Sequence, residues 1–409
     1  MIDLFVYLLV GLYVSIKIVL EVSQIFYIRK ATISADELHD YSIDLDYFKK
    51  SNAYNIDKLT LSIINIIISS LLLVYFIFSS GISDFSRYIE GINIFGLNNE
   101  LMIIIFFFIF LSMINIPIGL YKNFHIEDKY GFNRSNLALY IKDYLMSLIL
   151  SIVIVAVLFS VFNFIFQKYP NLWWFYMWVF YILFNIIVLF AYPTFIAPIF
   201  NNFKKLSDSR ITNVVRELSD KTKFNIADIY VMDGSRRSTH SNAYFTGFYK
   251  SKRIVFFDTL LNMLTPNEVK AVLAHEIGHY KKNHIMKSML LSLIISLVGF
   301  YLIYQITLIS SFYYRFDMNP NSAADVVIFF SFILPIIMFF LNPIFSSISR
   351  KNEFEADNYA KKFSNKNDLI SSLKKLYKEN LSLFKTNPLY SKIYNSHPTV
   401  FERINNLKL

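Results

Sequence analysis

Two histidines four residues apart, with a glutamate directly after the first, are the most chemically suggestive residues of this chain. They lie in the stretch AVLAHEIGHYKKNH, residues 271–284. On an α-helix His275 and His279 lie one turn apart on the same face, so both imidazoles can reach one metal ion. Glu276 lies beside them, where its carboxylate can take a proton from water at the metal. The spacing H-E-x-x-H is typical of zinc-dependent hydrolases.

A third ligand is needed, and the acidic stretch KNEFEADNYA, residues 351–360, offers candidates. Glu353 and Asp357 are four residues apart and share one helical face, whereas Glu355 points about 200° away from Glu353. We therefore assign Glu353 as the third metal ligand. Asp357 is expected to orient a ligating histidine, His275, through the other nitrogen of its ring. The alternative for such a cluster, a solvated helix face, is outweighed by its match to two histidines that lack a partner.

The composition of the chain indicates a membrane protein. Of the 409 residues, 55% are hydrophobic and 17% are charged, whereas a soluble domain is nearer half apolar and a quarter charged. There is no cysteine, so a metal site must use histidine and carboxylate ligands. Apolar runs of about 20 residues, long enough to cross a bilayer core, recur along the chain. We predict seven spanning helices, at 4–27, 59–80, 100–121, 145–166, 172–197, 287–310 and 324–348.

The formal net charge of +10 bears first on membrane topology. Lysine and arginine concentrate in alternate connecting segments, at 28–58, 122–142, 200–286 and after 349, and such residues accumulate in cytoplasmic loops. This asymmetry predicts a multi-pass membrane protein with its amino terminus outside (or lumenal) and its carboxyl terminus in the cytoplasm. The positive charge then faces anionic lipid headgroups of the bilayer, and no nucleic-acid partner is needed to explain it.

The spans and the polar stretches divide the chain into four parts. Residues 1–200 hold five spans with their loops, 201–286 form a polar segment with the H-E-x-x-H helix, 287–349 hold two more spans, and 350–409 form a second polar segment. The two polar segments are together long enough for one small domain. In the first, 211–222 has helical periodicity, 226–233 and 252–258 are predicted strands, and 242–248 is a strand or hairpin arm between them.

The helix that carries the motif has a strong start signal. Thr265 can cap it, Pro266 suits the first helical position, and Glu268 completes a capping box. No helix breaker follows until well into the sixth span, so we expect one continuous helix. Residues 279 and 353 can meet only if the chain between them crosses the membrane an even number of times, and it contains two spans. The metal is therefore expected at the cytoplasmic boundary of the membrane.

The resemblance to a known family extends well beyond one motif. Besides the H-E-x-x-H helix it rests on YKNFHIEDKYGFN (121–133), AYPTFIAPIFNNF (191–203), GSRRSTHSNAYFTGFYKSKRIVFFDTLL (234–261), SRKNEFEADNYA (349–360) and SHPTVFERI (396–404). In this order they resemble signatures of the integral-membrane zinc CAAX prenyl proteases of type I, the farnesylated-protein-converting endopeptidases. The resemblance runs from near residue 30 to the carboxyl end. It implies an α-helical membrane protein whose seven helices enclose a large intramembrane chamber, closed on the cytoplasmic side by a small α+β zincin-like domain.

The same resemblance implies a function and a site. The function is endoproteolysis beside the prenyl-cysteine of a C-terminal peptide, with one Zn²⁺ per chain held by His275, His279 and Glu353. Glu276 matches the catalytic glutamate, and Asp357 matches the acid behind the ligands.

Four further residues complete the expected site. Asn242 matches the residue that grips substrate backbone, and with Ala243 it belongs to an edge, 242–247, that would bind the peptide as an added strand. His397 and Arg403 match a late histidine and arginine that line the active site. We expect His397 to donate to the developing oxyanion and Arg403 to clamp the site or contact substrate.

Several interpretations stay open at this stage. A quality-control protease would apply the same chemistry to misfolded or unprenylated membrane-associated polypeptides. A seven-helix transporter or scaffold would bind no stoichiometric metal, and it has no need for two histidines, two acids and a positioned base together. The host membrane is a bacterial inner membrane or the endoplasmic reticulum.

Four polar residues near these features carry weaker expectations. His284 is expected off the ligand face and interfacial, and His240 is a candidate for the cleft wall because it lies close to Asn242 in the sequence. Lys17 and Glu21, four residues apart in the first span, are expected to pair or to face a watery cavity.

Overall fold

The computed structural model describes residues 2–92, 99–226, 228–246 and 253–409. Among these residues, seven helices are long and apolar enough to cross a membrane. They are α1 (Ile2–Lys30), α3 (Leu45–Phe78), α5 (Asn99–Tyr121), α6 (Leu137–Lys168), α7 (Trp173–Ala191), α12 (His284–Thr307) and α14 (Ala323–Phe363). The number and order of the predicted spans are thereby confirmed.

Shorter helices connect the spans or gather in the polar segments. Those outside the polar segments are α2 (Ala35–Tyr41), α4 (Gly81–Ile92), η1 (Lys122–Glu127), η2 (Tyr192–Ile196), α8 (Ala197–Phe200) and α13 (Ser310–Arg315). Of these, η1 continues α5, and η2 with α8 continues α7. Those of the polar segments are α9 (Ser209–Thr222), η3 (Gly234–Arg236), α10 (Asp258–Met263), α11 (Pro266–Lys281), α15 (Lys366–Glu379), α16 (Pro388–Tyr394) and α17 (Val400–Lys408). The predicted helix at 211–222 is therefore present as α9.

One small sheet stands beside these helices, with strands β1 (Phe203–Lys205), β2 (Asp228–Met232), β3 (Ala243–Thr246) and β4 (Arg253–Phe257) in the order β1-β2-β4-β3. β2 and β4 are parallel, and β3 runs antiparallel to β4. The three predicted strands are present, although residues 227, 247–248 and 252 of those predictions lie outside the described residues. The sequence did not reveal the short strand β1. Because β3 is at the end of the strand order, its outer edge has no strand beside it among the residues that the structure describes.

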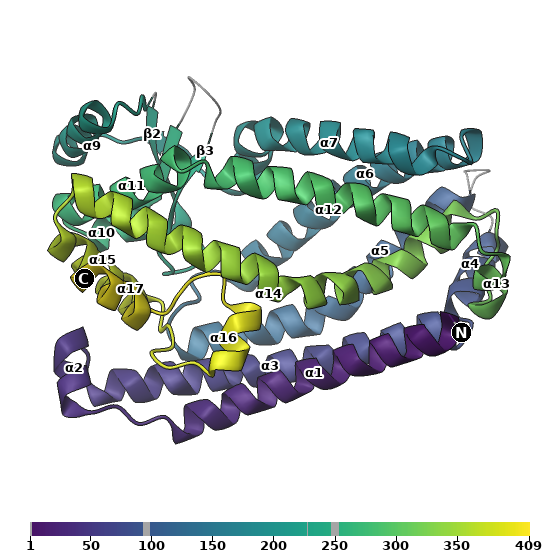
Figure 1. Cartoon of the computed structure of the whole chain (residues 1–409), viewed down its shortest axis with the longest axis horizontal. Coiled ribbons are helices and arrows are strands. Elements are labelled where there is room, and N and C mark those ends of the chain that lie inside the picture. Colours follow the sequence, from purple (N-terminus) through teal and green to yellow (C-terminus); the bar gives the residue numbers. More distant parts are fainter. Residues whose placement is uncertain (1, 93–98, 227, 247–252) are drawn as a thin grey trace.

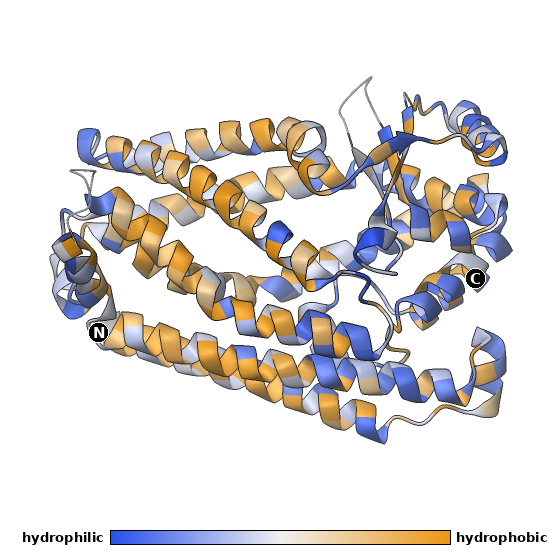
Figure 2. Cartoon of the chain, turned by 180° about the vertical axis from the view of Figure 1, so that it is seen from behind, coloured by the Kyte–Doolittle hydropathy of each residue, from blue (hydrophilic) through white to orange (hydrophobic). Residues whose placement is uncertain are grey.

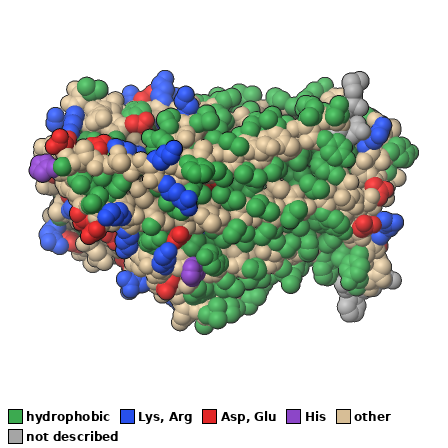
Figure 3. All heavy atoms as spheres, turned by 90° about the horizontal axis from the view of Figure 1, so that it is seen from below, with side chains coloured by type: hydrophobic (Ala, Val, Ile, Leu, Met, Phe, Trp, Pro, Cys, Tyr) green, Lys and Arg blue, Asp and Glu red, His purple; other side chains and the backbone are tan. Residues whose placement is uncertain are grey.

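The spans run side by side along the long axis, and the sheet and short helices collect at the end that holds the carboxyl terminus (Figure 1). Hydropathy follows this division: the helices are hydrophobic along their middle, and the end with the sheet is hydrophilic (Figure 2). On one face, hydrophobic side chains cover the middle and charged ones gather toward the ends (Figure 3). Large apolar side chains on the spans, such as Leu71 and Ile149, are exposed. This pattern fits a bundle whose middle is surrounded by lipid.

The bundle encloses polar space, as the predicted chamber requires. A cavity of about 280 Å³ lies among α1, α3, α5 and α14 and is lined by Lys17 and by Asn65 and Asn115. Lys17 and Glu21 do not pair with each other. The Lys17 ammonium donates to the Tyr13 hydroxyl at 3.1 Å, and the Glu21 carboxylate accepts from Ser62 at 3.0 Å. Both side chains face cavities, which is the second of the two arrangements expected for them.

The two polar segments pack around one hydrophobic core. Buried side chains from α9, β4, α11, α15 and α17 meet there, with Val215, Phe256, Leu273, Leu373 and Ile404 among them. Residues separated by two membrane spans therefore build a single small body at one end of the bundle.

Helix α11 lies at the centre of this body. It begins as predicted, with Thr265 and Glu268 forming a capping box ahead of Pro266. The buried Glu268 carboxylate also accepts hydrogen bonds from Ser371 at 2.6 Å and Lys375 at 2.7 Å. Although burial raises its pKa, the hydrogen bonds from Lys375, Ser371 and the Thr265 backbone hold the pKa of Glu268 below its ordinary value. Lys375 and Ser371 thereby tie α15 to the start of the motif helix.

The expectation of one continuous helix from α11 into the sixth span was wrong. α11 ends at Lys281 and α12 begins at His284, with Asn283 between them in the left-handed conformation at φ 56°. Asparagine tolerates this conformation better than most residues because its short polar side chain can hydrogen-bond locally. The break turns the chain between the motif helix and its span.

Candidate metal centre and active site

Helices α11 and α14 approach closely enough to place their side chains in one site. A Cβ added at Gly278 would lie 3.0 Å from the Ala356 Cα and 3.1 Å from its carbonyl oxygen. The glycine inside the H-E-x-x-H sequence therefore has a packing role, since a larger residue would push the two helices apart. Through this contact α14 brings Glu353 opposite the two histidines of α11.

The three predicted ligands form a compact triangle of donor atoms. The Nε2 atoms of His275 and His279 lie 3.2 Å apart. Glu353 places Oε1 3.2 Å from the His279 Nε2 and Oε2 3.4 Å from the His275 Nε2. Tetrahedral zinc with bonds of about 2.0–2.1 Å has ligand-to-ligand edges of about 3.3–3.4 Å. The three residues therefore bring their donor atoms close enough to share one zinc-sized ion, with Glu353 approaching each histidine through a different oxygen.

The surroundings of Glu353 support the same interpretation. Its side chain is buried, and Oε2 accepts no hydrogen bond among the described residues, although nitrogens of His397, His275 and Arg403 lie 3.1, 3.4 and 3.5 Å from it. A buried carboxylate needs positive charge or hydrogen bonds around it. The donor set and the basic surroundings of this carboxylate together fit a metal ligand.

His275 is held from behind by an acid and a guanidinium, and the predicted pairing is present. Its Nδ1 lies 2.8 Å from the Asp357 Oδ1, and Asp357 is fully buried. Arg403 donates to the same carboxylate through Nε at 2.9 Å and Nη2 at 2.6 Å. Although burial and the Arg403 guanidinium lower it, hydrogen bonds to Asp357 and Glu353 raise the pKa of His275 to about 9. The two carboxylates therefore favour a positive charge at the His275 ring, and a bound metal ion would supply such a charge.

His279 has an equivalent support that sequence reasoning missed. His284 places Nδ1 3.1 Å from the His279 Nδ1, and its Nε2 lies 3.2 Å from the Glu355 carboxylate. Glu355 does point away from Glu353, as expected, but it reaches His284. The prediction that His284 is interfacial was wrong, because only 4% of it is exposed. The break at Asn283 turns His284 inward, and the only signal available in the sequence was the residue type at 283, because asparagine tolerates the left-handed conformation.

We expect His284→Ala and Glu355→Gln to lower metal affinity about 10- to 100-fold, as loss of a support behind a metal ligand commonly does. Either change leaves the His279 ring free to rotate without removing a ligand. The measurement is competition for the bound metal by a chelator of known affinity. Lys287→Gln, on the same helix, is the matched control. A chelator midpoint equal to that of the unsubstituted protein would show that His284 does not position His279.

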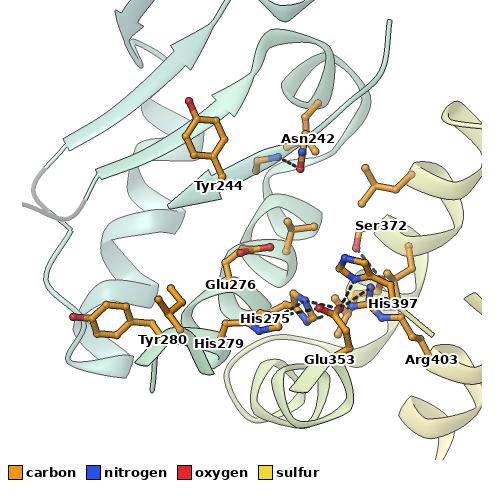
Figure 4. A pocket seen from close by; sticks show the side chains of 17 residues that line it. Asn242, Tyr244, His275, Glu276, His279, Tyr280, Glu353, Ser372, His397 and Arg403 are labelled. Atoms are coloured by element: carbon orange, nitrogen blue, oxygen red, sulfur yellow. Dashed lines mark hydrogen bonds and ion pairs between the residues drawn. The ribbon is translucent and has the colours of Figure 1, made fainter. Parts of the chain in front are cut away.

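Glu276, the predicted catalytic glutamate, faces an open cleft. A cavity of about 430 Å³ is lined by the metal-binding triangle, Glu276, Asn242, Ala243 and Tyr244. In Figure 4 Glu276 lies between the histidines and the strand that carries Asn242 and Tyr244. Among the described residues, none hydrogen-bonds to or ion-pairs with the Glu276 carboxylate. It is therefore available to a molecule in the cleft.

Asn242 stands at the start of the free edge of β3. Its Oδ1 accepts from the Ala243 backbone N–H at 2.8 Å, and its backbone carbonyl accepts from Phe257 at 3.0 Å. Its side-chain amide N–H groups remain available to donate. An edge strand beside a metal site can receive an extended peptide as an additional strand.

His397 and Arg403, the predicted site residues near the carboxyl end, differ in exposure and in contacts. His397 is largely exposed, with Nδ1 3.1 Å from the Glu353 Oε2, so its other ring nitrogen can face the cleft. Arg403 is buried, is bidentate to Asp357, and has Nη1 3.5 Å from Glu353. Its geometry suits the clamp better than a direct contact with substrate. His240 does not line the cleft, because its ring stacks on Phe132 and contacts Asn380.

Comparisons with known proteins agree with this geometry. The sequence profile described as "Peptidase family M48" matches residues 205–409, and the one described as "CAAX prenyl protease N-terminal, five membrane helices" matches residues 24–202. The chain is 39% identical over 311 residues to CAAX prenyl protease 1 of Saccharomyces cerevisiae, covering 72% of this chain and 68% of that protein. It is 37% identical over 298 residues to the CAAX prenyl protease 1 homolog of Arabidopsis thaliana, covering 71% and 69%.

A solved structure matches over almost the full length. The crystal structure of Ste24p from S. mikatae superposes with a TM-score of 0.90 at 33% sequence identity, and the match covers 98% of each chain. The likeness therefore extends to the membrane helices as well as to the polar end.

Proposed function

We propose that this chain, which belongs to peptidase family M48 and is a membrane-embedded metalloendopeptidase of the CAAX prenyl protease family, uses one zinc ion to cleave prenylated C-terminal peptides. The observation that carries the proposal is the triangle of His275, His279 and Glu353, which faces an edge strand across a cleft. The relatives named above are prenyl proteases by name, and part of the cleft wall is apolar, with Val272, Ile285 and Leu376 along it.

The residues of the cleft divide the chemistry among them. Zinc, when bound, would supply Lewis acidity that polarises the scissile carbonyl and lowers the pKa of water at the site. Glu276 takes the proton from the attacking water and delivers it to the leaving amine. His397 donates to the oxygen that gains negative charge, and Asn242 with the edge of β3 holds the peptide backbone in place. Asp357 and His284 keep the two imidazoles in their binding orientations.

The proposal extends to the membrane. The lysine-rich segments and the metal site lie at the same end of the bundle, which supports a cytoplasmic site and carboxyl terminus with the amino terminus on the other side (Figure 1). A prenyl group inserted in the cytoplasmic leaflet would then lie at about the same membrane depth as the metal site.

The test is the cleavage of two peptides that differ only in the prenyl group. We expect the purified protein to cleave a farnesylated CAAX peptide at least about 10-fold more efficiently than its unprenylated twin, since burying even a few prenyl methylenes gives about 0.8 kcal/mol each. Equal efficiency would instead support a quality-control protease. Absence of cleavage of both peptides by zinc-loaded protein would contradict the proposal.

A further inference from the structure

A second cavity adjoins the metal site and differs from it in chemistry. It measures about 530 Å³ and lies between α1 and α3 on one side and the segment from Tyr377 to Thr399 on the other. Apart from Leu59 and Leu383, its lining side chains are polar or charged. His397 lines both this cavity and the metal-site cavity, so the two spaces meet at that residue.

Three buried polar atoms in the wall of this cavity have no partner among the described residues. They are Oε2 of Glu21, Nε2 of Gln24 and the hydroxyl of Tyr394. Glu21 is 4% exposed and Gln24 is fully buried. The remaining polar atom of each side chain is used, since Ser62 donates to Glu21 Oε1 at 3.0 Å and the Asn387 backbone N–H donates to Gln24 Oε1 at 2.8 Å. The wall thus presents unsatisfied donors and acceptors, which a prenyl chain cannot satisfy and a peptide backbone can.

The cavity also holds a cation without a carboxylate partner. Lys58 lines it, and among the described residues no acid forms an ion pair with its ammonium group. The ammonium lies over the ring of Tyr54, 4.8 Å from the ring centre. The hydroxyl of that tyrosine donates to Glu127 at 3.0 Å, and the Glu127 carboxylate attracts the Lys58 ammonium without forming an ion pair with it. A free carboxylate entering the cavity would find this ammonium available.

We infer that this cavity binds the part of the substrate that follows the scissile bond, with its terminal carboxylate at Lys58 and its amide groups at Glu21, Gln24 and Tyr394. The inference rests on the proposed function. A three-residue fragment spans about 10 Å when extended, so its length suits a substrate that runs from the metal site past His397, the residue that both cavities share. After cleavage the fragment has an ammonium group at its new end, and Glu21 is the acid in the wall that can receive it.

The test compares a CAAX peptide that ends in a free carboxylate with the same peptide that ends in an amide. For the unsubstituted protein we expect the KM of the amide to be about 10- to 100-fold higher, which is the effect of one charge-assisted hydrogen bond. Lys58→Met should raise the KM of the free acid to that of the amide with little change in kcat, and Lys58→Arg should keep most of the preference. Lys17→Met is the matched control, because Lys17 lines the separate cavity deeper in the bundle.

Three results would overturn the inference: no preference by the unsubstituted protein, a preference that survives Lys58→Met, or a preference that is lost in Lys17→Met. If Lys58→Met does not fold, inhibition of the unsubstituted protein by the free tripeptide acid and its amide decides the question, with the acid expected to inhibit more strongly. The proposed function can be contradicted independently of this inference. If the farnesylated peptide is not preferred, the acid and amide forms of the unprenylated peptide test this cavity in the same way.

Discussion

Glu276→Gln should lower turnover about 10²- to 10⁴-fold while the metal remains bound. Glutamine keeps the shape of the side chain but cannot accept a proton from water. Because none of the described residues hydrogen-bonds to or ion-pairs with the Glu276 carboxylate, the change removes no polar interaction of the fold. The measurement combines single-turnover cleavage of a membrane-associated peptide with elemental analysis of the same sample.

The matched control for this variant is Glu379→Gln, the same change at an exposed position at the end of α15. It should leave both turnover and metal content unchanged. Full turnover in metal-loaded Glu276→Gln would show that another group takes the proton. A loss of metal would show instead that Glu276 has a structural part in the site.

Glu353→Gln should lower the zinc content from about one ion per chain to near zero and abolish cleavage with it. The substitution removes the negative charge that faces two imidazoles, while the buried Arg403 guanidinium, 3.5 Å from Glu353, stays in place. A neutral amide is a poor zinc ligand, and a zinc ion that enters the site would then meet the uncompensated positive charge of Arg403. Elemental analysis after dialysis against a mild chelator measures the loss.

Lys351→Gln, an exposed change on the same helix two residues earlier, is the control for that experiment and should retain zinc. Stoichiometric zinc in Glu353→Gln would contradict the assignment of the third ligand. The remaining candidate would then be His397, which already lies 3.1 Å from the Glu353 carboxylate.

Periodicity and hydropathy predicted much of this fold. They located the seven spans and the motif helix with its capping box. They also showed that Glu353 and Asp357, four residues apart, share a helical face from which Glu355 points away. They located the apolar part of α3, from residue 59, but did not reveal that the helix begins at Leu45, because residues 45–58 are largely polar and hydropathy cannot follow a helix past the lipid. For the same reason the predicted seventh span ends at 348, although α14 continues to Phe363.

The parts of the site that the sequence did not reveal depend on tertiary contacts. Pairing His284 with His279 requires the left-handed turn at Asn283, and nothing in helical periodicity predicts a break at an asparagine that follows two lysines. The role of Gly278 is visible only once α11 and α14 are in contact. The polar cavity at Lys58 joins residues more than 300 positions apart in the sequence, so no local pattern indicates it.

The 41 residues of α14 form one helix that contains both a membrane span and the carboxylate ligand. At 1.5 Å per residue this is a rod of about 60 Å. The histidines, in contrast, are on a helix that the turn at Asn283 separates from its own span. The depth of Glu353 relative to the headgroups is therefore set by how α14 sits in the bilayer, and the two imidazoles follow it, because Gly278 and Asp357 tie α11 to α14. A change in lipid thickness would therefore move the whole metal site relative to the headgroups without altering its coordination.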